Sequence, residues 1–477
     1  MPSSMERPHN NLLRAALAAS AVAVLSGAAA TERGEHDSTE LQPPADAPNA
    51  SVGIDAALAR VDAVRSRADA DSLALEDALT VLGDAYVDAS QYTSAAASFN
   101  KALHLAEQHA GLESERVLAP LLGLANALFA SGRHEQAVVR LQRALAIQRA
   151  QYGLFDVSQQ ETLKTLAKSL TTLDRVSEAQ ELMIYRARVA EKTYGEGTTQ
   201  VIPSLCDLGN WFADVGMSPE ARMAFQTALN IAGDKSSLNA PIIIEPLRGI
   251  ARAHMLRVSY PEAWLRPRSP PGCFAIGQEC RPPYPHDADG HLIVEPRKLD
   301  PEGEYALQRA LRILQADPGA WTQTHIETLL QMGDWYQIKN SPREALPYYQ
   351  RAWRLIHEAR TLPSSAATAL SAPLRVYYPT PQIVANTLPQ SVEETRSHYV
   401  QLEFTVESNG SVSDARIVDH DTRDRYAGDV LDAVRASRFR PKFVDGHAVA
   451  TPRIAYREVF WTATPVGSGS TVPDLQN

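Results

Sequence analysis

The chain has 477 residues, of which 44% are hydrophobic and 21% charged, as is typical of a folded protein. This length suits about three ordinary domains or one long repeat array. Its formal net charge of −10 argues against a nucleic-acid-binding protein, because phosphate binding needs a basic face. Beyond the N-terminus, no apolar run is long enough to cross a bilayer.

Residues 1–30 have the pattern of a secretion signal. Arg7 and Arg14 supply positive charge, a run of small apolar residues follows, and an A-x-A cleavage site ends at Ala30. An uncleaved membrane anchor is the alternative, but the apolar core is short and rich in alanine. Residues 31–50, rich in Pro, Ala and acidic side chains, are expected to form a disordered spacer.

A helical hairpin begins the ordered part of the chain. Leu82-Gly83 lies on one face of its first helix, and Ala95, Phe99 and Ala102 follow in the second helix at i, i+4 and i+7. This spacing is that of a buried stripe. Because two helices approach closely only where side chains are short, the small residues predict a tightly packed pair.

The anchor alanine recurs at intervals of 42 residues, at Ala95, Ala137, Ala179, Ala221 and Ala263. A last copy, Ala345, follows after one further interval and 40 extra residues. The pattern resembles the tetratricopeptide repeat in the extended form found in kinesin light chains and many bacterial repeat proteins. The resemblance implies a mainly α-helical solenoid of about six units over 51–363, headed by a capping helix at 51–70 and carrying an insert at 265–302.

The insert contains Cys273 and Cys280, which we expect to form a disulfide in an oxidising compartment. Cys206, in the fourth unit, is expected to be a packed thiol. A metal site at the cysteine pair is less favoured, because a second ligand pair at conventional spacing is missing. His286 and His291 flank an acidic turn that lacks the later ligand of a calcium loop. We therefore predict no metal site.

A row of polar residues follows the small pair in the first helix of each unit, and such positions line the concave face of a solenoid. The row consists of Asp84, Asn126, Lys168, Asn210, Arg252 and Asp334, and the neighbouring Lys164 and Arg248 add to a basic stretch across units three to five. The predicted groove residues are Asn126, Lys164, Lys168, Asn210, Arg248 and Arg252. Asparagine would hold the backbone of an extended peptide, and lysine and arginine its acidic groups. An ordinary solvated face is the alternative.

After a linker at 364–371, the hydrophobic period changes from 3.6 to 2. Apolar residues alternate from Val400 to Val406, and Asn409-Gly410 favours a two-residue type I′ turn. This turn would place Leu402 opposite Ile417, Phe404 opposite Ala415, and Glu403 opposite Arg416. A helix at Tyr426–Phe439, stopped by Pro441, and a third strand at Ile454–Trp461 complete the predicted module.

The strand-strand-helix-strand order, with Leu431-Asp432-Ala433-Val434 and Phe439-Arg440-Pro441, resembles the TonB C-terminal domain over 372–464, before a flexible tail at 465–477. In that family the domain lies in the periplasm, and an extended segment of an outer-membrane receptor pairs along its final strand. The resemblance implies a partner-binding edge here. Its residues would be Arg453, Ile454, Ala455, Tyr456, Arg457, Val459 and Phe460.

The sequence carries no Gly-x-Ser-x-Gly elbow, phosphate loop, His-Glu-x-x-His or Cys-x-x-Cys, so we expect neither catalysis nor a cofactor. We expect a non-enzymatic periplasmic scaffold of a Gram-negative bacterium that binds protein or peptide partners in the cell envelope. One alternative is a TonB-family energy transducer, anchored in the inner membrane, that acts on outer-membrane receptors and transport. Another is an enzyme or metalloprotein centred on the insert.

Overall fold

The structure is a computed structural model. It describes residues 48–66, 72–235, 241–259, 299–316, 321–359, 362–379 and 395–463. The predicted signal, residues 31–47 of the predicted spacer and the pair Cys273 and Cys280 lie outside these residues. The last three residues of the spacer, 48–50, are helical and belong to α2, which corrects its predicted end. The chain divides into two compact units, Met1–Leu208 and Gly209–Asn477, and each is described by itself.

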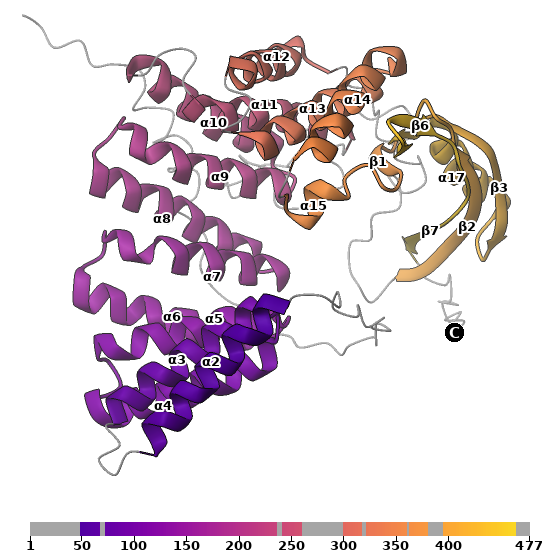
Figure 1. Cartoon of the computed structure of the whole chain (residues 1–477). Coiled ribbons are helices and arrows are strands. Elements are labelled where there is room, and N and C mark those ends of the chain that lie inside the picture. The colour runs from indigo at the N-terminus through magenta and orange to yellow at the C-terminus, as the bar shows by residue number, and fades with distance from the viewer. Residues whose placement is uncertain are drawn as a thin grey trace, which may run out of the picture. The chain divides into compact units, whose positions relative to one another are not determined.

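The first unit is a stack of helices in which each helix from α2 to α8 packs against the next (Figure 1). The helices are α2 (Pro48–Arg65), α3 (Ser72–Asp88), α4 (Tyr92–Ala110), α5 (Leu118–Ala130), α6 (His134–Tyr152), α7 (Gln160–Thr172), α8 (Val176–Tyr194) and the start of α9 (Ile202–Asp214). The predicted capping helix is confirmed as α2, which packs against α3 through Ala57, Val61 and Val64.

The connections between hairpins follow one design. Helices α4, α6 and α8 each end at a glycine with φ near 91°, the left-handed region that favours glycine. After two of these glycines, the side chain of Ser114 or Asp156 accepts a hydrogen bond from the backbone N–H two residues later, and a short 3₁₀ turn starts the next hairpin. The repeated sequence therefore produces a repeated turn.

Packing between hairpins depends on small residues facing an aromatic ring. A Cβ atom added at Gly83 or Gly123 would lie 2.6 or 2.4 Å from the ring of Phe99. In the second unit, Gly209 and Gly249 flank the ring of Phe225 in the same way. The anchor alanines Ala95, Ala137, Ala179 and Ala221 are fully buried. The predicted close packing is confirmed.

The second unit also begins with packed helices. Its helices after α9 are α10 (Ser218–Lys235), α11 (Ile244–Ser259), α12 (Pro301–Ala316), α13 (Thr322–Ile338), α14 (Pro342–Glu358) and the short α15 (Ser364–Ala367). The sequence assigned the fifth anchor to Ala263, which lies outside the described residues. Helix α12 packs on α11 instead. There Gly303, buried Leu307 and buried Ala310 repeat the spacing of Ala345, Tyr349 and Ala352, 42 residues earlier. Gly303 therefore takes the position in α12 that Ala345 takes in α14, and the assignment to Ala263 stays a prediction.

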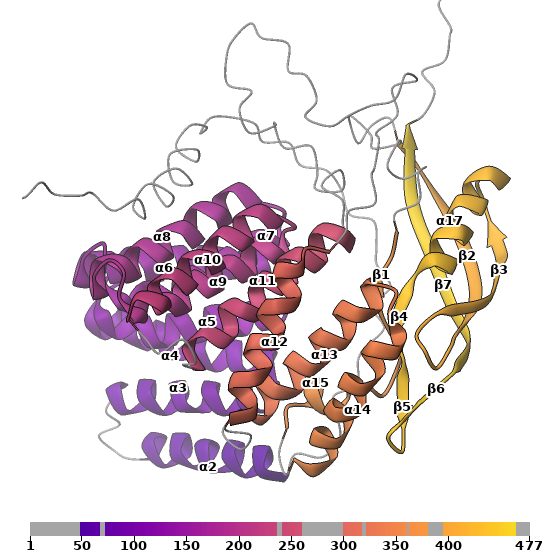
Figure 2. The same cartoon turned by 90° about the horizontal axis from the view of Figure 1, so that it is seen from above.

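A strand-rich module follows the last helical hairpin. It contains β1 (Leu374–Tyr377), β2 (Thr395–Val406), β3 (Val412–His420), α17 (Asp424–Ala436), β4 (Arg438–Arg440), β5 (Lys442–Val444), β6 (His447–Val449) and β7 (Thr451–Ala463). The main sheet has the order β3-β2-β7, and β1 pairs with β4 and β5 with β6. Helix α17 lies beside the main sheet (Figure 2), where Val430 and Val434 pack against Leu402 and Phe404.

The turn between β2 and β3 differs from the expected two-residue type. The backbone N–H of Gly410 donates to Glu407 and that of Glu407 donates to Ser411, so the loop has three residues. Only Gly410 in it has a positive φ, at 84°, whereas a type I′ turn needs two such residues. A bulge at Asp414 then restores the expected pairs Leu402–Ile417 and Glu403–Arg416.

The same bulge interrupts the expected pairing of Phe404 with Ala415, because the register shifts between Glu403 and Thr405. The end of the helix was also predicted wrongly. Helix α17 ends at Ala436, well before Pro441, and β4 follows it at once. Pairing of β4 with β1 competes with continuation of the helix, and tertiary pairing of this kind leaves no local signal in the sequence.

Candidate functional site

The second unit contains a cavity of about 970 Å³ on the side where α9, α11, α13, α15 and β1 meet. Three of the six predicted groove residues, Asn210, Arg248 and Arg252, line it. Its other charged or amide-bearing lining residues are Asp214, Glu245, Glu327, Gln331, Asp334, Arg375 and Arg440, and its larger apolar ones are Met255, Leu256, Leu330, Leu374 and Val376. The repeat pattern thus identified one wall of the cavity.

The arginines of this wall face acidic side chains rather than an open surface. Arg248 Nη2 lies 2.9 Å from Glu327 Oε2, and its Nη1 lies 3.4 Å from Glu245 Oε2. Arg252 donates to Asp214 and, more weakly, to the side-chain oxygen of Asn210. The expected basic stretch is therefore a mixed wall. It can recognise a ligand that carries both donors and acceptors.

One end of the cavity is closed by a buried ion pair. Arg440 of β4 donates from Nε to Asp334 Oδ1 of α13 at 3.0 Å and forms a second bond from Nη2 to Oδ2. The hydroxyl of Tyr349 donates to the same Oδ1 at 2.8 Å. Arg440 and Asp334 are each 8% exposed, so the pair is almost fully desolvated.

Burial affects the pKa values of Tyr349 and Arg440, the two residues that pair with Asp334. Burial raises the pKa of Tyr349 far above its ordinary value, and the negative charge of Asp334 raises it further. Burial alone would lower the pKa of Arg440, but the charge of Asp334 and its hydrogen bonds raise it overall. Arg440 consequently stays charged and Tyr349 stays protonated throughout the working pH range.

Other contacts fix the strand module on the last hairpin. Gln337 Nε2 donates to the backbone oxygen of Asn409 at 2.9 Å, and Arg438 Nε donates to Asn340 Oδ1 at 2.9 Å. The backbone N–H of Phe443 donates to Leu370 at 2.9 Å. The module and α13 therefore form one packed body, in which β1 and Arg440 complete the cavity.

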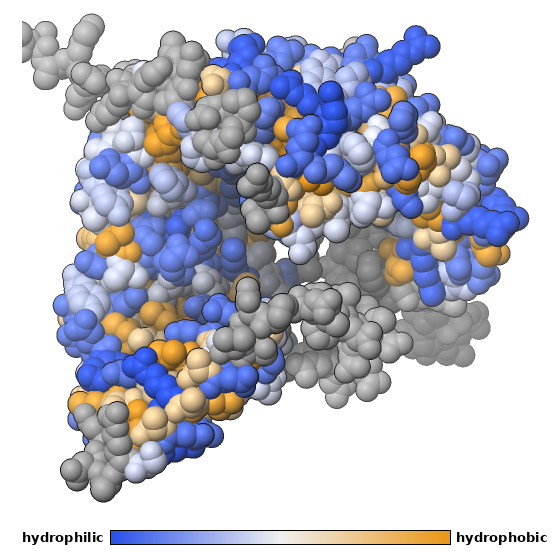
Figure 3. Space-filling view, in the orientation of Figure 1, coloured by the Kyte–Doolittle hydropathy of each residue, from blue (hydrophilic) through white to orange (hydrophobic). Residues whose placement is uncertain are grey.

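In the first unit, Lys164 belongs to a charged cluster that also contains Arg186, Asp207 and Glu161, whose Oε1 lies 3.8 Å from Arg186 Nη2. Lys164 Nζ lies 3.0 Å from Asp207 Oδ1, and Arg186 Nη2 lies 2.8 Å from Asp207 Oδ2. Arg186 is 4% exposed, and its Nη1 has no hydrogen-bond partner among the described residues. Lys168 is exposed one turn along α7, where hydrophilic residues gather on the surface of α7 and α8 (Figure 3). Asn126 is exposed on α5.

The predicted strand edge lies on β7. Within the described residues, β7 pairs with β2 alone, so its other edge has no strand against it. Ile454 and Tyr456 pack against the core of the module, and burial together with a hydrogen bond to Glu458 raises the pKa of Tyr456 to about 12. The Arg457 guanidinium lies 4.0 Å from the centre of the Tyr399 ring.

The remaining predicted edge residues occupy positions of several kinds. Arg453 has φ 57° at the point where β7 bulges, and its side chain is exposed. Ala455 and Val459 are also exposed. Phe460 lies in β7, but its side chain is outside the part that the structure describes. Along β7 the predicted residues therefore alternate between exposed side chains and half-buried ones, and the half-buried Ile454 and Tyr456 pack on the core of the module.

Sequence reasoning missed the acidic partners Asp207 and Glu327, and it missed Arg186 and Arg440. Asp334 follows Met332-Gly333 and was placed in the polar row by the rule that selected Arg252, but its pairing with Arg440 was not foreseen. The others carry no spacing signal.

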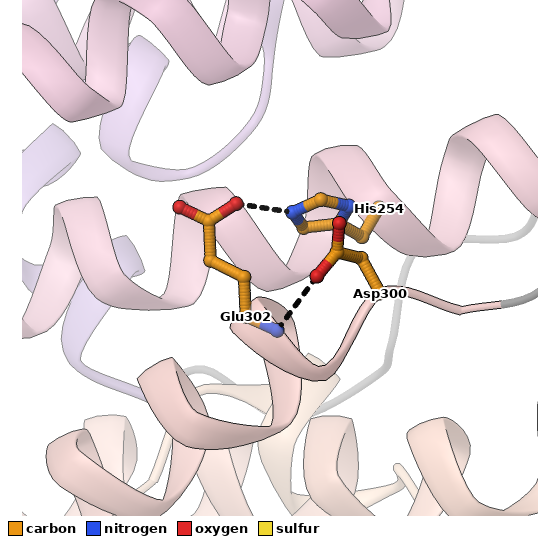
Figure 4. Close-up of side chains that lie close together, drawn as sticks. All are labelled: His254, Asp300 and Glu302. Carbon is orange, nitrogen blue, oxygen red and sulfur yellow. Dashed lines mark hydrogen bonds and ion pairs between the residues drawn. The ribbon is translucent and has the colours of Figure 1, made fainter.

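Cys206 is 5% exposed within α9, as expected of a packed thiol. A different group, His254, Asp300 and Glu302, brings possible metal ligands together (Figure 4). No helix in the described ranges has the length and apolar character needed to span a membrane.

Stacked hairpins with small anchors against aromatic rings define a tetratricopeptide-type repeat scaffold, a fold class that binds proteins and peptides. The family model of the tetratricopeptide repeat matches residues 76–109, which span most of α3 and α4. A search of curated proteins found no match.

Several solved structures are similar. A putative kinesin light chain with nearly identical TPR-like repeats from Podosopora anserina is 18% identical, with 52% of this chain and 99% of that chain covered and a TM-score of 0.39. BtubC (BKLC) from P. vanneervenii is 14% identical, with 66% and 96% covered and a TM-score of 0.37. A Rap protein complexed with competence and sporulation factor is 14% identical, with 65% and 70% covered and a TM-score of 0.34.

Proposed function

We propose that this chain is a non-enzymatic scaffold that holds an extended segment of a partner protein in the cavity of its second unit. The observation that supports this proposal is the cavity, which has a volume of about 970 Å³ and is lined by side chains of α9, α11, α13 and β1. Its mixed charges and its apolar residues suit a peptide, which offers donors, acceptors and apolar side chains together. Asn210 and Gln331 bring amide groups to the wall. Their NH2 groups donate to Glu245 and to the backbone oxygen of Arg248, and a bound peptide backbone would take the place of these partners.

We further propose that the charged cluster of the first unit binds an acidic group of a partner. Asp207 and Glu161 balance the charges of Lys164 and Arg186, and Lys168 adds one further exposed positive charge nearby. A carboxylate reaching Lys168 and Lys164 would complete the neutralisation without burying a new unpaired charge.

We extend the proposal to the cellular compartment of the protein and to the partner of its strand-rich module. The leader pattern and the resemblance to the TonB C-terminal domain support a periplasmic protein whose β7 edge receives an extended segment of a cell-envelope partner. The unpaired edge of β7 in the described part of the chain supports strand addition there. N-terminal sequencing of protein from cell fractions tests the compartment, with a mature start at Thr31 expected. An intact N-terminus in the cytoplasmic fraction would refute it.

Site-specific photocrosslinking in cells tests the cavity. A photoreactive residue replaces Leu374, which lines the cavity and is 50% exposed. The matched control replaces Tyr305, which is 62% exposed on α12 of the same unit and does not line the cavity. We expect one partner at Leu374, absent at Tyr305, and lost when Arg248→Glu and Arg252→Glu reverse the wall charges.

The proposed cavity function is wrong if the two positions capture the same proteins, or if charge reversal leaves the adduct at Leu374 unchanged. Circular dichroism of the charge-reversal variant separates loss of binding from loss of fold. Photocrosslinking at the exposed Val459 of β7 tests the strand edge independently, because a partner of that edge is expected to survive the charge reversal in α11.

A further inference from the structure

Three side chains converge where α11 and α12 meet, at the two borders of the insert (Figure 4). His254 lies in α11, Asp300 immediately precedes α12, and Glu302 lies in the first turn of α12. One ligand atom from each lies within 4.8 Å of the other two. His254 is 4% exposed, so its imidazole is buried against the carboxylates rather than turned to solvent.

Each carboxylate also has a local structural role. His254 Nε2 lies 2.9 Å from Glu302 Oε2. Asp300 Oδ1 accepts a hydrogen bond of 3.0 Å from the backbone N–H of Glu302, as an N-cap does. The cap uses one oxygen of Asp300 and leaves Oδ2 available. Arg222 Nη1, at 3.6 Å from Glu302 Oε2, is the further charged group beside the cluster.

We propose that His254, Asp300 and Glu302 bind a divalent transition-metal ion of the zinc type. Zinc takes nitrogen and carboxylate oxygen at about 2.0–2.2 Å, so two of its ligands at angles near 90–110° stand roughly 2.9–3.5 Å apart. The 2.9 Å between Nε2 and Oε2 matches this separation. An imidazole ligand favours zinc, cobalt or nickel over calcium and magnesium, which prefer all-oxygen sites.

The net charge of this cluster also favours the binding of a cation. Asp300 and Glu302 contribute two negative charges and Arg222 one positive charge, which leaves one negative charge when His254 is neutral. The Arg222 side chain is 52% exposed and can move away from Glu302 when the ion enters. On binding, the ion takes the place of the imidazole proton on Nε2, and that proton passes to solvent.

Such a site would fasten the start of α12 to α11, across the segment 260–298 that separates them in the chain. A crosslink between the ends of a long connection stabilises the folded state, because it removes chain entropy from the unfolded state. The ion would therefore complete the fifth repeat unit. This role is independent of the peptide cavity, so either proposal can fail alone.

Zinc titration of the full-length chain by calorimetry, after removal of metal with a chelator, tests the site. The titration uses a C273S/C280S background so that no thiol pair of the insert contributes. Asp300→Asn is the sharpest variant, because asparagine caps a helix as well as aspartate but is a poorer zinc ligand. We expect it to weaken zinc binding at least tenfold and to leave the melting temperature of the metal-free protein unchanged.

His254→Gln and Glu302→Gln are expected to remove one bound zinc ion per chain and the zinc-dependent rise in melting temperature. Cobalt should give a visible absorption band that the same variants lose. The proposal is overturned if the background protein binds no zinc, if Asp300→Asn and His254→Gln bind it as the background does, or if calcium binds as tightly as zinc.

Discussion

Replacing Asp334 by asparagine should loosen the strand module from α13. The change leaves the Arg440 guanidinium buried and charged without its carboxylate. Among the described residues it keeps only neutral acceptors, which are the amide oxygen of the new side chain, the Tyr349 hydroxyl and the backbone oxygen of Ala369, at 3.4 Å. Both partners of the pair are 8% exposed, so water cannot readily replace the lost carboxylate. Breaking such a buried pair on one side costs about 3–5 kcal/mol. The double variant D334L/R440M removes both charges and should cost far less than D334N alone.

Hydrogen exchange of the amides in β4 and β5 measures this local loss, because a long repeat array need not unfold in a single step. A cost of about 3 kcal/mol corresponds to exchange more than a hundredfold faster in D334N. Glu403→Gln is the matched control, since it breaks the Glu403–Arg416 pair, whose arginine side chain is 69% exposed. An exposed pair contributes less than about 1 kcal/mol. Equal effects of D334N and the control, or a double variant as labile as D334N, would refute the reasoning.

Two further changes test the core. Gly249→Ala would place a Cβ atom 2.3 Å from the Phe225 ring and should destabilise the second unit by about 1–3 kcal/mol in urea unfolding, whereas Gly233→Ala, with no atom within 4 Å, should not. Burial, and then the charge of Arg351, lower the pKa of His325 below its ordinary 6.5. As pH falls below that value, the unfolded chain gains a proton that the folded one does not, so stability should fall by at most about 1.4 kcal/mol per pH unit. His325→Leu should flatten this dependence, and a slope that persists in the variant would contradict it.

The solenoid could be predicted from the sequence because the residues that pack its helices together recur at a regular spacing along the chain. Gly83, Gly123, Gly209 and Gly249 face the ring of Phe99 or Phe225, and the small and large packing residues recur at the same 42-residue interval. After the insert, the 42-residue count no longer identifies the residue that packs between the helices. Ala263 continues the count along the chain, but Gly303 stands at the anchor position in space, where an added Cβ would lie 2.3 Å from the Trp335 ring. Counting residues cannot show on which side of an insertion the next helix resumes.

The groove was predictable only in part for the same reason. Arg248 and Arg252 follow from their places in the repeat, but their acidic partners Glu327 and Asp214 come from other helices. Arg440 belongs to a Phe-Arg-Pro sequence that resembled a helix end, and its role depends on pairing with Asp334, 106 residues away. Side chains that meet only through tertiary packing leave no periodic signal.

Arg440 connects the cavity with the docking of the module. It lines the cavity and also forms the buried pair that holds β4 on α13. Residues of β1, which pairs with β4, line the cavity as well, so the cavity is complete only while the module is docked. A ligand that binds the complete cavity must therefore stabilise docking, by RT ln(1 + [L]/Kd) at free ligand concentration [L]. D334N should therefore weaken a cavity ligand in two ways, by loosening the docked module and by removing a carboxylate that itself lines the cavity.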